Sequence, residues 1–89
     1  MLRYSKKTHM VKRVLEFLNS LSRKDDGNTW ASGEEIQKKT GLTPVVINDA
    51  IKTAEDGGLV QSETHHGTPP FNFTTVTITD EGRSWLESH

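Results

Sequence analysis

Basic side chains are concentrated near the start of this chain, and their chemistry is the binding of anions. Residues 1–24 carry seven Lys or Arg residues and one acid, whereas the rest of the chain carries four basic and 11 acidic residues. The net charge of −1 therefore divides into +6 for the first segment and −7 for the second. This asymmetry indicates a nucleic acid, an acidic partner, or association between oppositely charged patches of two copies.

Two adjacent histidines, His65 and His66, are further candidates for ligand binding. When protonated they can contact phosphate groups. Neighbouring residues on a strand point to opposite faces, and the sequence offers no third ligand, so we expect neither a metal site nor a cofactor. The sequence shows no Ser-His-Asp spacing, glycine-rich phosphate loop or nucleophile elbow. We therefore expect a protein that is not an enzyme.

The length of 89 residues, 31% of them hydrophobic, predicts one small domain over residues 1–89 with a lean core. We expect residues 1–7 to form a flexible basic arm. No apolar run approaches the roughly 20 residues that a membrane-spanning helix needs, and the first residues do not resemble a signal peptide. The absence of cysteine excludes disulfides and fits a reducing compartment, so we expect a cytoplasmic protein without membrane contact.

Three helices follow from apolar spacing and capping residues. The first is predicted over 8–23. The second, over 33–40, begins with a capping box of Ser32 and Glu35 and ends at Gly41. In the third, Thr43 is the cap, Pro44 takes the first position, and a buried stripe ends before Gly57-Gly58. That stripe comprises Ile47, Ala50, Ile51 and Ala54.

The remaining residues predict a β-hairpin followed by a short helix. Segments 59–66 and 71–79 are typical of strands, with a turn between them, and Thr79 is expected to cap the last helix. We expect Trp85 and Leu86 to face inward, and Phe71 and Phe73 to form a satellite cluster under the hairpin or to contact a partner. The predicted core comprises Val14, Phe17, Leu18, Leu21, Trp30, Ile36, Leu42, Ile47, Ile51, Leu59 and Val76.

The order of these elements resembles the winged helix-turn-helix superfamily. The stretch "SGEEIQKKTGLTPVVINDAIKTAEDGGLV" is similar to the helix-turn-helix and wing entry of small archaeal and bacterial regulators. The stretch "VTITDEGRSWLE" is similar to the closing strand and helix of MarR-like and PadR-like proteins. The resemblance implies an α+β, mostly helical fold: a three-helix core, a C-terminal β-hairpin wing and a short terminal helix. It also implies a small transcriptional regulator that binds double-stranded DNA.

In such regulators the third helix enters the major groove. The resemblance then assigns base contacts to the outward residues of that helix, which are Thr43, Val45, Asn48, Asp49 and Lys52. Asn48 would form paired bonds with adenine, Lys52 would reach guanine or phosphate, and Val45 would touch a thymine methyl group. Asp49 departs from the pattern, because a carboxylate repels phosphate and its one useful base contact is a cytosine amino group.

Phosphate contacts are expected from the basic arm and the first helix, with His65 and His66 at the wing. These phosphate-binding residues are Arg3, Lys6, Lys7, Lys12 and Arg13. A second hypothesis is a winged-helix module that binds a protein and not DNA, since the third helix is acidic and the wing has no Lys or Arg. A homodimer through the first and last helices is a further hypothesis, with Leu15 and Trp85 as its apolar contacts.

Overall fold

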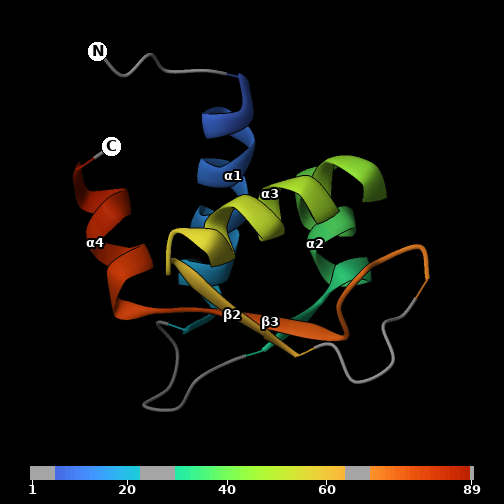
Figure 1. Cartoon of the computed structure of the whole chain (residues 1–89). Helices are drawn as coiled ribbons and strands as arrows, with labels where there is room; N and C mark the ends of the chain where they lie inside the picture. Colours follow the sequence, from blue (N-terminus) through green and yellow to red (C-terminus); the bar gives the residue numbers. More distant parts are fainter. Residues whose placement is uncertain (1–5, 23–29, 64–68, 89) are drawn as a thin grey trace.

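The computed structural model describes residues 6–22, 30–63 and 69–88. Within these residues, four helices and a three-stranded antiparallel sheet form an α+β, mostly helical fold (Figure 1). The elements are α1 (Lys6–Ser22), β1 (Ala31–Ser32), α2 (Gly33–Thr40), α3 (Pro44–Asp56), β2 (Val60–Glu63), β3 (Thr75–Ile78) and α4 (Asp80–Ser88). Because α1 begins at residue 6, the backbone of Lys6 and Lys7 belongs to this helix and not to the predicted arm.

The corner between α2 and α3 is built by the predicted capping residues. The Ser32 hydroxyl accepts the Glu35 N–H at 3.2 Å, and the Glu35 carboxylate accepts the Ser32 N–H at 2.9 Å, which confirms the capping box. Gly41 ends α2 in the left-handed region, with φ of 76°. The Thr43 hydroxyl then caps α3 by accepting the Val46 N–H, and Pro44 occupies the first helical position.

The core lies where α1, α2 and α3 meet the sheet. The predicted stripe of α3 is confirmed, since its four members are at most 3% exposed. Phe17, Leu21 and Leu59 are partly buried at the margin of the core. The prediction for Trp30 is wrong, because this side chain is 36% exposed. Side chains alternate along extended backbone, and the neighbouring Ala31, which is fully buried, takes the inward position.

The sheet has the order β1-β3-β2, so β3 is its central strand. Val76 of β3 is paired with Ala31 on one side and with Ser62 on the other. The antiparallel pairing of β2 with β3 was predicted, but both strands are shorter than expected. Phe71 and Phe73 precede β3 and are 4% and 2% exposed. They belong to the main core, so the predictions of a satellite cluster and of partner contacts there are wrong.

The start of α4 is tied to the turn after α3. The Thr79 hydroxyl accepts the Gly82 N–H at 3.0 Å, as expected of a cap, and donates to the Gly58 carbonyl at 2.7 Å. Trp85 and Leu86 are partly buried against the core. Leu15 is completely buried, because α1 packs against α2, α3, α4 and β3. It therefore cannot serve as the predicted dimer contact.

Candidate nucleic-acid interface

The face of α3 that points away from the core carries four of the predicted base-contacting residues in exposed positions. Thr43, Asp49 and Lys52 are exposed, and Val45 is 77% exposed. This arrangement follows from the helical period, because the buried stripe occupies one side and leaves these residues on the other. A large apolar side chain that is so exposed is available to a partner, whether that partner is a thymine methyl group or a protein.

The charges on this face are mostly acidic. Lys52 lies 3.9 Å from Asp56, one turn further along α3, and both side chains are largely exposed to solvent. An exposed pair of this kind contributes little to stability, at most about 1 kcal/mol. The Lys52 ammonium thus remains able to reach another anion. Asp49 and Glu55 are also exposed on α3, so the helix by itself presents a negative surface.

Asn48 differs from the other predicted base contacts, because its carboxamide already has two partners. Its Nδ2 atom donates to the Pro70 carbonyl at 3.0 Å, and its Oδ1 atom accepts the Asn72 N–H at 2.9 Å. The side chain is half-buried. The period of α3 placed Asn48 on the outward face with the other base contacts, but its side chain turns to the segment before β3, and no local pattern points to partners that are 22 and 24 residues away.

Three exposed cations come from α1 and from the last turn of α2, just before the turn that leads into α3, and we call this set the basic corner. It comprises Arg13 of α1 and Lys38 and Lys39 of α2, all exposed. The Arg13 guanidinium donates to the Thr40 carbonyl at 2.5 Å, which fixes the position of this α1 side chain at the end of α2. Cations suit the last turn of a helix, where the carbonyl groups carry a partial negative charge.

Arg13 was among the predicted phosphate contacts, but Lys38 and Lys39 were not. A signal for both was present, since they occupy the last turn of α2 just before the predicted tight turn at Gly41. Lys12 is half-buried on α1, next to Arg13.

Several predicted contacts fall on parts of the chain that are not described. Arg3, His65 and His66 lie outside the described residues, and the same holds for the side chains of Lys6 and Lys7. Their roles stay predictions.

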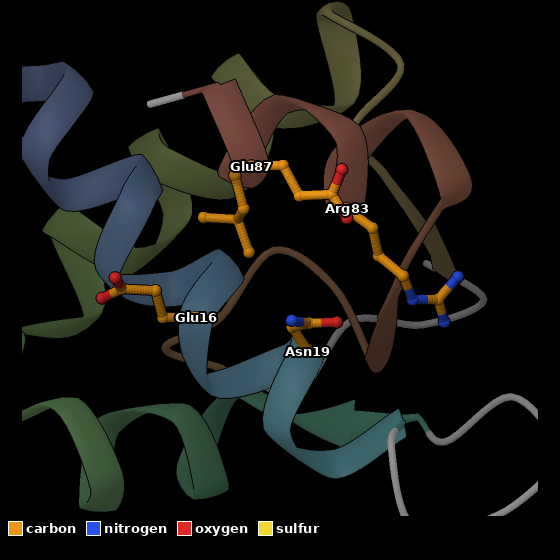
Figure 2. Close-up of a pocket in the computed structure, with 5 residues that line it drawn as sticks. Glu16, Asn19, Arg83 and Glu87 are labelled. Atoms are coloured by element: carbon orange, nitrogen blue, oxygen red, sulfur yellow. The ribbon is translucent and has the colours of Figure 1, made fainter.

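A separate hollow lies between α1 and α4, with a volume of about 470 Å³. Glu16 and Asn19 of α1 line one side, and Arg83 and Glu87 of α4 line the other (Figure 2). The Arg83 guanidinium points away from Glu16 (Figure 2) and pairs with Asp80 at 2.8 Å. Arg83 is thus directed at Asp80 and not at Glu16 across the hollow.

Among the described residues, no cluster of three His, Cys, Asp or Glu side chains could hold a metal ion. Each helix in that part of the chain is too short or too polar to cross a membrane. Comparisons with protein-family models, with curated proteins and with solved structures gave no match to this chain.

Proposed function

We propose that this protein is a winged helix-turn-helix DNA-binding protein that acts as a small transcriptional regulator. The element order supports this assignment, because a helix, a short strand, two helices joined by a tight turn, a hairpin and a last helix follow one another. The sheet order β1-β3-β2 adds the first strand to the edge of the hairpin. A fold of this kind hosts several functions, so the functional argument rests on the surface.

The observation that carries the proposal is the hydrogen bond from Arg13 to the Thr40 carbonyl. Thr40 comes three residues before Thr43, the cap of α3. A cation of α1 and the two lysines at the end of α2 therefore stand at the entrance to the helix that would enter the major groove. Affinity for DNA comes mainly from such phosphate contacts, which need not be on the groove-reading helix itself.

The two surfaces have different roles in this proposal. The basic corner, together with Lys12 and the N-terminal cations Arg3, Lys6 and Lys7, attracts the phosphate backbone. The outward residues Thr43, Val45 and Lys52 of α3 touch base edges. Asp49 restricts binding, because its carboxylate accepts only from a base amino group and repels nearby phosphate groups. A carboxylate close to phosphate weakens binding to sequences that offer it no amino group.

A salt titration of duplex binding tests the basic corner. The double variant Lys38→Gln/Lys39→Gln should bind mixed-sequence duplexes more weakly than the wild type. Its plot of log affinity against log salt should be shallower by about 0.9 for each phosphate group that the variant no longer neutralises. Arg83→Gln is the matched control, because Arg83 is on α4 and pairs with Asp80. Fluorescence anisotropy of a labelled duplex at about 50 to 200 mM salt measures both quantities.

Two results would count against these assignments. If the wild type does not bind any duplex at about 50 mM salt, where non-specific attraction is strong, the DNA proposal fails. If the double variant and the control keep the slope of the wild type, the basic corner is not a phosphate site.

A second candidate is a protein-interaction module, and the exposure of Val45 favours it. At 77% exposure this side chain presents apolar surface on a helix whose acids repel phosphate. Absence of DNA binding, together with a partner interaction that Val45→Ser weakens and Gln61→Ser does not, would support this candidate. Gln61 is an exposed residue of β2 and serves as the control.

A further inference from the structure

The segment that leads back into the sheet, residues 69–73, is bound to α3 by two hydrogen bonds of one side chain, Asn48. We call these residues the return segment. Asn48 donates to the Pro70 carbonyl at 3.0 Å and accepts from the Asn72 N–H at 2.9 Å. One carboxamide thus bonds to the backbone on both sides of Phe71, and it does so with its donor and its acceptor together.

Phe71 provides a second attachment, to α2. Its ring lies over Gly33, the first residue of that helix, where an added Cβ atom would lie 2.3 Å from the ring Cγ. The absence of a side chain at Gly33 is therefore what admits the ring. Phe73 packs beside Phe71 with the ring centroids 5.9 Å apart, and both rings are buried. The return segment is consequently held by α2, by α3 and by the core.

These contacts conflict with the predicted base-reading role of Asn48. Paired bonds to adenine use an amide N–H donor and the amide oxygen of the same side chain at once. In this fold both groups are directed at the return segment, on the hairpin side of α3. Reading a base would require Asn48 to release Pro70 and Asn72, and the return segment would lose these two hydrogen bonds to α3.

We propose that Asn48 is a positioning residue, which fixes the hairpin against α3 so that both present one rigid surface. The consequence for DNA rests on the proposed function. If α3 and the hairpin meet the duplex together, loss of the Asn48 bonds changes their relative orientation and weakens every complex, whatever the sequence. Loss of a base-reading residue would instead weaken binding to one preferred sequence.

The attachment itself is tested without DNA. In the wild type, NMR should detect a scalar coupling across the hydrogen bond between the Asn72 amide nitrogen and the Asn48 side-chain carbonyl carbon. Amide exchange at Asn72 should accelerate about five- to tenfold in Asn48→Ala, since one hydrogen bond protects it. Asn48→Asp keeps the acceptor for Asn72 but loses the donor to the Pro70 carbonyl, so exchange at Asn72 should be slower than in Asn48→Ala. Gln61→Ala is the control and should leave Asn72 unchanged.

An absent coupling, or Asn72 exchange that is equal in the wild type and in Asn48→Ala, would overturn the proposal. If Asn48→Ala does not fold, the coupling in the wild type and the exchange rate of Asn72 in Asn48→Asp still test whether Asn48 binds the return segment.

The functional consequence is tested with a preferred duplex, selected from a random pool, and an unrelated one. Asn48→Ala should weaken binding to both by the same factor, whereas Ser84→Ala, at an exposed residue of α4, should weaken neither. A loss confined to the preferred duplex would overturn positioning in favour of base reading. If the wild type binds neither duplex, the proposed function fails. The coupling and exchange measurements at Asn72 then remain as the test of the hydrogen bonds between Asn48 and the return segment.

Discussion

Replacing Gly82 with alanine should destabilise this protein, although the same change inside an ordinary helix is stabilising. In a helix interior alanine is more favourable than glycine by about 1 kcal/mol. At Gly82, however, the new Cβ atom would lie 2.3 Å from the Leu59 carbonyl oxygen and 2.7 Å from the Cγ1 atom of Ile78. Both distances are far below van der Waals contact, so the start of α4 or the chain at Leu59 must move.

The Leu59 carbonyl cannot retreat without cost. It accepts the Thr79 N–H at 3.0 Å, and the Thr79 hydroxyl donates to the adjacent Gly58 carbonyl at 2.7 Å. Overpacking of a tight site costs about 1–3 kcal/mol, and a broken hydrogen bond adds about 1 kcal/mol. After subtraction of the gain in helix propensity, we expect Gly82→Ala to lower the free energy of unfolding by about 1–3 kcal/mol.

Urea unfolding followed by far-UV circular dichroism measures this difference. With a slope of about 1–3 kcal/mol per molar urea for a protein of this size, the midpoint should fall by about 1 M. Ser84→Ala is the matched control, because Ser84 is an exposed residue of the same helix. It should stabilise by at most about 0.5 kcal/mol. A midpoint for Gly82→Ala at or above that of the wild type, with an unchanged slope, would refute the packing argument.

Three further predictions concern the core, the α3 surface and self-association. Ile51→Ala should cost about 2–5 kcal/mol in the same unfolding assay, because this side chain is 3% exposed. Asp49→Asn should tighten binding to random-sequence duplexes in anisotropy titrations by removing a repulsion, and unchanged affinity would place Asp49 away from phosphate. If the protein forms a dimer through α1 and α4, light scattering at high concentration should give twice the monomer mass, and Trp85→Ser should reduce it; a monomer mass for the wild type rules that dimer out.

The local elements were largely predictable from the sequence, because short-range rules decide them. Ser32 and Glu35 are three residues apart, and their capping box needs nothing beyond α2 itself. The same holds for the start of α3 at Thr43 and Pro44. The outward face of α3 also followed from the helical period, with Val45 as its most exposed apolar residue.

What the sequence did not reveal depends on contacts between distant segments. Phe71 and Phe73 were assigned to a strand because aromatic residues favour strands, yet a glycine 38 positions before Phe71 receives its ring. Asn48 matched a base-reading residue in type and spacing, but the return segment takes its carboxamide. The position of Arg13 beside the end of α2 also depends on a distant contact, since it arises only when α1 packs against α2.

The strand order β1-β3-β2 determines when the sheet can form during translation. The ribosome makes β1 and β2 before β3, and β1 and β2 each pair with β3 and not with each other. Strands β1 and β2 therefore have no pairing partner until residues 75–78 emerge. Until then the nascent chain can form helices but not this sheet. At about 5–20 residues per second, the interval from Glu63 to Ile78 lasts about one to three seconds. A translational pause within that interval would lengthen the time for which both strands are unpaired and open to chaperones or to aggregation.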